Sequence, residues 1–178
     1  MKKMLVMLTL LCVALLPFAA MAESATSSIT WEEVGAPMAE AAGLDGNFYS
    51  LEDIGLAIWL PAGIQFVEVS AEDAAAGYLY VASDEEETCL ITVDYVNVEG
   101  MTLDGVLEEA VAQGMFEPEI VVINGLSAVS YKDEANHAGC IVLVDTNCNV
   151  ITFTVLPVES EEEELAFALI MSSLMPLE

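Results

Sequence analysis

Alternation of apolar and polar side chains predicts most of the strands. In residues 150–156, apolar side chains at alternate positions are separated by Thr152 and Thr154, which is typical of a strand with one buried and one solvent-facing side. In residues 54–60, both alternating sets are apolar or small, which favours a strand covered on both faces. Shorter apolar runs predict further strands at 48–51, 65–69, 78–82, 88–96, 119–123, 126–131 and 139–144.

A capping box predicts the start of the first helix. The Thr30 hydroxyl is placed to accept from the backbone N–H of Glu33, and the Glu33 side chain is placed to reach back to Thr30. An apolar stripe at helical spacing follows, with Pro37 inside it and Gly43 at its end. Because proline removes a helical hydrogen bond, we expect a kinked or split helix.

Three later segments also have helical signals. Thr102 is placed to cap a helix that ends near Gly114. A short Ala-rich helical turn is predicted at 71–76. The acidic run 159–164 starts a final helix, because negative charge is favoured at a helix N-terminus, and the apolar residues after it predict that this helix is largely buried.

Turn residues predict how the strands are joined. Asn124-Gly125 favours a type I′ hairpin turn, because both residues tolerate positive φ. Thr146-Asn147 is interpreted as a two-residue hairpin turn, and the acidic loop 84–87 as the connection of another hairpin. The order of elements then predicts an α+β fold with a single antiparallel sheet and helices packed on its faces.

The N-terminal residues predict export. Lys2 and Lys3 precede an apolar run, and Ala20-Met21-Ala22 has the small-x-small pattern that a signal peptidase recognises. We expect a signal peptide at 1–22, a flexible mature N-terminus at 23–28 and a single α+β domain at 29–178, secreted or extracytoplasmic after cleavage near Ala22. A retained membrane anchor is less favoured, because the apolar run is shorter than the ~20 residues of a spanning helix.

The net charge of the chain restricts which classes of partner it can bind. The chain has 30 acidic residues, three lysines and no arginine, with a net charge of −27. Removal of the leader would leave Lys132 as the only basic side chain, which argues against nucleic acid, phosphate and anionic membrane surfaces as ligands. The expected partner is an unknown protein or cell-envelope component, with a basic protein favoured on charge, and membrane contact is expected only through the signal peptide during export. We also expect crowded carboxylates to raise one another's pKa, so that stability increases as pH falls.

The cysteines leave the disulfide question open. Cys89, Cys140 and Cys148 follow the leader, and an odd number leaves at least one unpaired within the monomer. Cys140 and Cys148 lie too far apart along the predicted hairpin to be bridged. A bridge between Cys89 and Cys140 would need neighbouring strands, so buried thiols that act as small apolar side chains are the favoured interpretation.

Candidate metal ligands are confined to acidic runs. The first consists of Asp84, Glu85, Glu86 and Glu87, and the second of Glu161, Glu162 and Glu163. Each run could hold Ca²⁺ weakly, although a solvated charge run is the favoured interpretation and no other cofactor is expected. Residues 145–149 begin like an EF-hand loop, but Val150 and Leu156 stand where glycine and glutamate are required.

Catalytic candidates are few. His137 lies three residues before Cys140, and with Cys148 these residues could form a nucleophile–base pair or a zinc site, but positions three apart on a strand face opposite ways. We therefore expect no catalytic residues. The favoured function is a secreted, non-catalytic binding or accessory module, with an extracytoplasmic divalent-cation-binding protein as the alternative and a hydrolase less favoured.

Three stretches carry a resemblance to a known family. Residues 51–61, residues 123–131, and residues 150–157 with the helix that follows them together resemble small secreted bacterial proteins of the PsbP-like α/β/α sandwich class, whose members here are uncharacterised. The resemblance covers about residues 47–176. It implies an α/β/α sandwich and a non-enzymatic binding or accessory role, and no functional residue set transfers with it.

Overall fold

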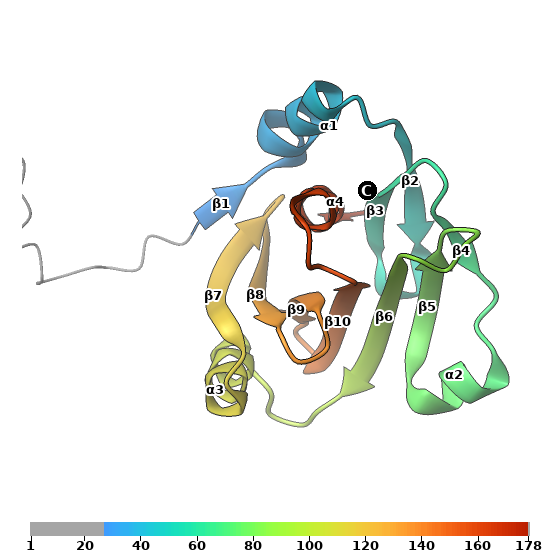
Figure 1. The fold of residues 1–178 in the computed structure, drawn as a ribbon. Helices are drawn as coiled ribbons and strands as arrows, with labels where there is room; N and C mark the ends of the chain where they lie inside the picture. The colour runs from blue at the N-terminus through green and yellow to red at the C-terminus, as the bar shows by residue number, and fades with distance from the viewer. Residues whose placement is uncertain (1–26, 178) are drawn as a thin grey trace, which may run out of the picture.

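The computed structural model describes residues 27–177, which form two sheets and the helices packed on them (Figure 1). The predicted signal peptide 1–22 lies outside the described residues, as does most of the segment 23–28. The boundary placed after residue 28 falls inside a strand, because Ser27–Ile29 form β1. Within the described part of the chain, no helix is long and apolar enough to cross a membrane.

The larger sheet has eight strands in the order β1-β7-β8-β9-β10-β6-β5-β4. All neighbours pair antiparallel except β1 and β7, which are parallel, with Ile29 opposite Ile123. The strands are β1 (Ser27–Ile29), β4 (Gln65–Val67), β5 (Tyr78–Ser83), β6 (Leu90–Asn97), β7 (Phe116–Ile123), β8 (Leu126–Asp133), β9 (Ala138–Val144) and β10 (Asn149–Leu156).

A second, three-stranded sheet has the order β11-β3-β2, from Met175–Pro176, Leu56–Pro61 and Gly46–Leu51. The predicted single antiparallel sheet is therefore wrong: there is one mixed sheet and one smaller antiparallel sheet. β3 is covered on both faces, as predicted, but an apolar pattern does not say which strands will be its neighbours. The parallel β1 pairing comes from Ser27–Ile29, which show no alternation that could have predicted a strand.

Six helical segments connect the strands. They are the π-helical turn η1 (Trp31–Gly35), α1 (Ala36–Ala42), the 3₁₀ turn η2 (Glu52–Ile54), α2 (Ala71–Ala76), α3 (Leu103–Gln113) and α4 (Glu161–Ser172). The predicted caps are confirmed at Thr30 and Thr102, whose side chains accept from Glu33 and Gly105 backbone N–H groups. The expected break at Pro37 is the passage from η1 into α1, with the proline in the first turn of α1.

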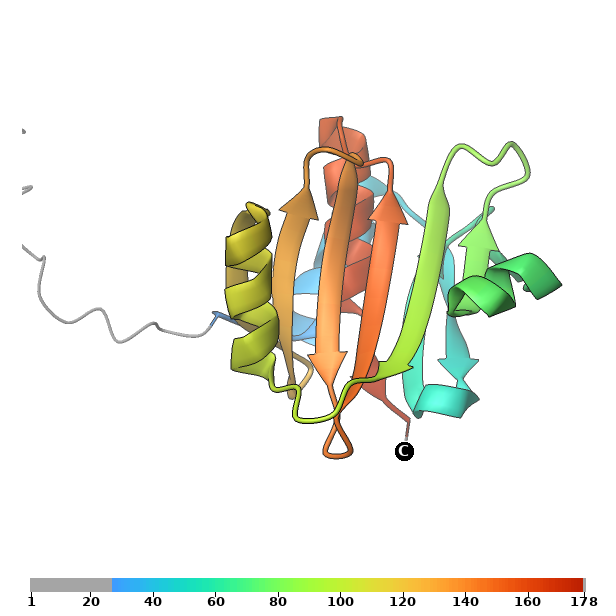
Figure 2. The same cartoon turned by 90° about the horizontal axis from the view of Figure 1, so that it is seen from below.

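The main core lies between the inner face of the larger sheet and a layer formed by α4 and the smaller sheet (Figure 1). Phe153 of β10, Ile58 of β3 and Ile170 of α4 belong to one buried cluster. On the outer face, α3 packs on the β7–β8–β9 part of the sheet, with Val106 against Val129 and Val142 (Figure 2). The arrangement leaves α4 with its C-terminal half in the core and its first turn at the surface.

Asp94 lies on the outer face of β6, opposite Thr152 of β10. Partial burial raises the pKa of its carboxyl group, so the folded protein disfavours the ionised form. Asp94 therefore binds its proton more tightly in the folded state than in the unfolded state. The ionised carboxylate lowers the stability of the fold at neutral pH, and this loss of stability disappears as pH falls from the raised folded pKa to the unfolded pKa.

Asp94→Asn is therefore expected to raise the melting temperature at pH 7. The gain should shrink as pH falls through the raised pKa of Asp94 and should be lost below about 4, the ordinary pKa of an aspartate, where Asp94 is protonated in both states. Thermal unfolding of both proteins across this pH range would measure the difference, with the exposed Asp45→Asn as a control for the change in net charge. A melting-temperature gain that is independent of pH, or equal in the control, would contradict the assigned cause.

Candidate functional site: a cleft at the start of α4

The β5–β6 loop is organised by Asp84. Its carboxylate accepts from the Thr88 hydroxyl, from the Thr88 backbone N–H at 2.7 Å and from the Cys89 backbone N–H at 3.3 Å. These hydrogen bonds, with the Thr88 hydroxyl as the largest contribution, lower the pKa of Asp84. The first acidic run is thus a folded turn with a fixed negative charge.

The N-terminus of α4 is a complete capping box. The Ser160 hydroxyl accepts from the Glu163 N–H at 3.2 Å, and Glu163 Oε2 accepts from the backbone N–H groups of Glu159 and Ser160, both at 2.9 Å. The bond from Glu159 is the largest of several that lower the pKa of Glu163. The capping box therefore satisfies the backbone N–H groups of Glu159, Ser160 and Glu163 at the start of the helix.

The predicted mutual raising of carboxyl pKa values is wrong for these two groups. The pKa values of Asp84 and Glu163 both move in the opposite direction, because backbone and hydroxyl donors stabilise the charged form more than desolvation destabilises it. Each group therefore favours folding above its unfolded pKa and loses that contribution as pH falls through its folded pKa.

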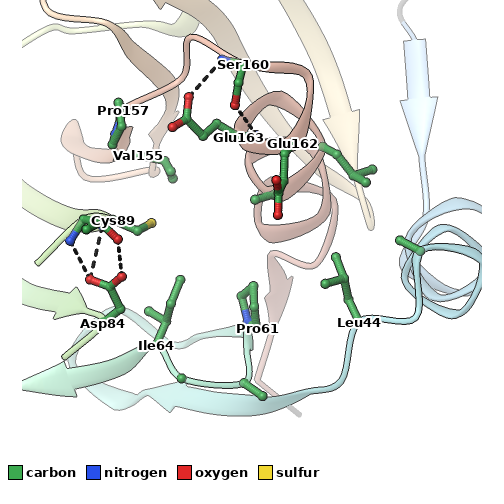
Figure 3. A pocket seen from close by; sticks show the side chains of 16 residues that line it. Leu44, Pro61, Ile64, Asp84, Cys89, Val155, Pro157, Ser160, Glu162 and Glu163 are labelled. Atoms are coloured by element: carbon green, nitrogen blue, oxygen red, sulfur yellow. Dashed lines mark hydrogen bonds between the residues drawn. The ribbon is translucent and has the colours of Figure 1, made fainter. Parts of the chain in front are cut away.

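The two acidic runs meet at one cleft of about 490 Å³, which Figure 3 shows from close by. Of the seven predicted candidates, Asp84, Glu162 and Glu163 line it, whereas the other four do not. Across residues 27–177, no group of three His, Cys, Asp or Glu side chains is arranged to hold a metal ion. The calcium hypothesis stays a prediction, and two of its carboxylates already accept bonds from the chain.

Most of the cleft wall is apolar. It comes from the end of α1 and the segment after it, the β3–β4 turn, the end of β10 and the first half of α4; the apolar lining residues include Leu44, Pro61, Ile64, Val155, Pro157, Leu165 and Ala166. The sequence patterns did not identify Leu44 or Ile64, because each lies between elements, where no periodicity exists. The available sequence signal was a leucine directly after the helix-ending Gly43, and the structure leaves this leucine exposed.

Cys89 is the one thiol in this cleft. Burial, with smaller contributions from the charges of Asp84 and Glu163, raises the pKa of Cys89 to about 11. The group is therefore a protonated thiol at neutral pH, and thiolate is the form that acts as a nucleophile or soft metal ligand.

The three cysteines among residues 27–177 are free. Cys89 and Cys140 belong to segments on either side of β10, so they are not on neighbouring strands. Cys140 faces Thr154, with 3.8 Å between Sγ and Oγ1, and Cys148 lies in the β9–β10 turn. The buried-thiol interpretation describes Cys140, which is 6% exposed.

The predicted two-residue turn at 146–147 is wrong. Asn149 lies opposite Asp145, so the turn has three residues, and Cys148 adopts a φ of +60°. Asp145 Oδ1 accepts from the N–H groups of Asn147 and Asn149, at 2.7 and 2.9 Å, which fixes the longer turn.

His137 lies away from the cleft, in the β8–β9 loop. Its Nδ1 is 2.9 Å from Glu159 Oε1, and it lines a separate polar cavity of about 440 Å³ with Lys132, whose Nζ is 2.6 Å from Glu164 Oε1. The Cys140 thiol contacts Thr154, and no hydrogen bond or metal-binding group among the described residues joins it to His137, so the predicted alternatives of a catalytic pair or a zinc site have no support in this geometry.

Comparison with known proteins finds similarity only among solved structures, and that similarity is distant. No family model matches the chain, and no curated protein matches it. A solved structure of a protein from Bacteroides thetaiotaomicron VPI-5482 is 10% identical, with a TM-score of 0.46 over 75% of this chain and 49% of that one. The chain thus spans about half the length of that protein, and nothing in the comparisons connects it with the PsbP-like class.

Proposed function

We propose that this chain is a non-catalytic binding or accessory module that holds an apolar group of its ligand in the cleft at the start of α4. The observation that carries the proposal is the cleft itself, which combines apolar walls with a few fixed polar groups. Its volume of about 490 Å³ falls in the range of small-ligand sites. Both of its acidic walls are held by hydrogen bonds, so the shape is formed before a ligand arrives.

The chemistry of the cleft supports binding in preference to catalysis. Nucleophilic catalysis needs an effective base beside the nucleophile, and the carboxylates near Cys89, Asp84 and Glu163, are weak bases with lowered pKa values that already accept hydrogen bonds from the chain. The histidine of the described chain is in another cavity, paired with Glu159. Ser160 and Thr88 use their hydroxyl groups in local hydrogen bonds.

An extracytoplasmic location is part of the proposal and depends on the leader sequence alone. Lys2 and Lys3, the apolar run and Ala20-Met21-Ala22 support export. An accessory role outside the cell is also what the resemblance to PsbP-like proteins would imply, although that resemblance depends on the sequence stretches alone.

Nile red, an uncharged fluorescent dye, provides the test of the cleft. We expect the purified protein to bind one equivalent, and Ala166→Phe to weaken binding by about tenfold or more because its ring fills the cleft. Ala168→Phe is the matched control, since this exposed position lies on the same helix outside the cleft. Ala62→Phe, from the β3–β4 turn, repeats the test if Ala166→Phe does not fold. Absence of dye binding, or equal affinities for all variants, would refute the proposal.

A further inference from the structure

The mouth of the cleft is negative on two sides. Asp84 stands on the β5–β6 loop, and Glu162 and Glu163 stand across from it on the first turn of α4 (Figure 3). No Lys or His lines this cleft; the two that the structure describes, Lys132 and His137, line the separate polar cavity instead. The negative potential at the cleft is therefore not compensated locally.

An anionic ligand does not fit this site. A helix N-terminus can bind anions through its N–H groups, but the first turn of α4 carries four glutamates (161–164) that repel an anion, and Glu163 already accepts from the N–H groups of Glu159 and Ser160. Glu162 has no such internal role: it is exposed, makes no hydrogen bond among the described side chains, and is free to meet a ligand.

A free strand edge begins beside the cleft. Ile64 is part of the cleft wall, and β4 starts at the next residue, Gln65. β4 is the last strand of the larger sheet, paired on one side with β5 and on the other with no strand of residues 27–177. Such an edge offers backbone donors and acceptors to an extended peptide.

We infer that the cleft accepts an apolar side chain of an extended, basic peptide segment, whose ammonium or guanidinium groups lie against Glu162 and Asp84. The apolar walls supply affinity, and the acidic mouth selects against negative and neutral competitors. The inference rests on the proposed function of the cleft, to which it adds the chemistry of the ligand.

Four tetrapeptides with uncharged, blocked termini test this ligand class. Their affinities are measured by displacement of Nile red and by calorimetry. They are Lys-Leu-Leu-Lys, Gln-Leu-Leu-Gln, Glu-Leu-Leu-Glu and Lys-Ser-Ser-Lys. We expect Lys-Leu-Leu-Lys to bind most tightly, with an affinity that falls as salt is added because the charges are exposed. The neutral peptide should be weaker, and the acidic and serine peptides weakest.

The variant Glu162→Gln tests whether a negative charge at the mouth of the cleft, and not the net negative charge of the protein, attracts the basic peptide. We expect it to weaken Lys-Leu-Leu-Lys binding by about 2- to 5-fold, the size of an exposed ion pair, and to leave Gln-Leu-Leu-Gln binding unchanged. Glu161→Gln is the matched control, because it removes the same charge from the same helical turn at a position outside the cleft. Neither residue belongs to the capping box.

The outcomes distinguish a failure of the inferred ligand class from a failure of the proposed binding cleft. If Nile red binds in the cleft but the neutral peptide equals the basic one, or no peptide displaces the dye, the ligand class is wrong and the binding cleft stands. If Glu161→Gln and Glu162→Gln weakened Lys-Leu-Leu-Lys binding equally, the specific role of Glu162 at the mouth of the cleft would likewise be wrong. If the basic peptide binds but Ala166→Phe does not weaken it, the peptide binds elsewhere and the inferred ligand class is wrong; the cleft proposal itself fails only if Ala166→Phe also leaves Nile red binding unchanged.

Discussion

Asn124→Asp is expected to lower the free energy of unfolding by about 3 kcal/mol at neutral pH, because one side chain joins three segments. Asn124 Nδ2 donates to the carbonyl oxygens of Ser172 and Leu174, both at 2.8 Å, and Oδ1 accepts from the Trp31 N–H at 2.7 Å. An aspartate keeps the acceptor, but it removes both donors and points a carboxylate oxygen at two carbonyl oxygens. These partly buried carbonyls would then lack a partner.

Urea unfolding at pH 7 and at lower pH measures this effect. A protonated aspartic acid recovers one donor, so the loss should become smaller as pH falls through the pKa of the new carboxyl group. Asn47→Asp is the matched control: this exposed β2 residue makes no side-chain hydrogen bond among the described groups, and we expect a change within about 0.5 kcal/mol. A similar loss in both variants, independent of pH, would contradict the assigned role of Asn124.

The same residue shows how far sequence patterns reach. Asn124-Gly125 predicted a type I′ turn, and the positive φ values of +47° and +84° confirm it. The turn depends on two adjacent residues, so a local pattern contains it. The side-chain bonds of Asn124 reach residues 93, 48 and 50 positions away, and no local pattern indicates them.

The burial of individual strands was predictable from the sequence, whereas their pairing into sheets was not. The burial of β3 on both faces and of alternate β10 residues was predicted and is confirmed, because burial follows from side-chain polarity. Which strands pair depends on loop paths and long-range packing, and there the single-sheet prediction was wrong. For the cleft, acidic runs identified Asp84, Glu162 and Glu163, but the apolar wall is built from segments brought together only by the fold.

Phe153→Ala has the other large expected effect, a loss of about 3–5 kcal/mol in the free energy of unfolding. Phe153 is the largest of the fully buried side chains and lies on β10, which pairs with β6 and β9 on its two sides. Its ring belongs to the core cluster that also contains Ile58 of the second sheet and Ile170 of α4. Removal of the ring leaves a cavity between these layers that the three elements cannot all move to fill.

Thr152→Ala provides the comparison on the same strand, because its side chain faces the outer side and is partly exposed; we expect about 1 kcal/mol or less. Chemical unfolding of both variants, followed by circular dichroism, measures the two losses. Phe153→Leu should lie between the wild type and Phe153→Ala, since it keeps part of the buried volume. If Thr152→Ala were as damaging as Phe153→Ala, the assignment of the inner face of β10 to the space between the two sheets would be wrong.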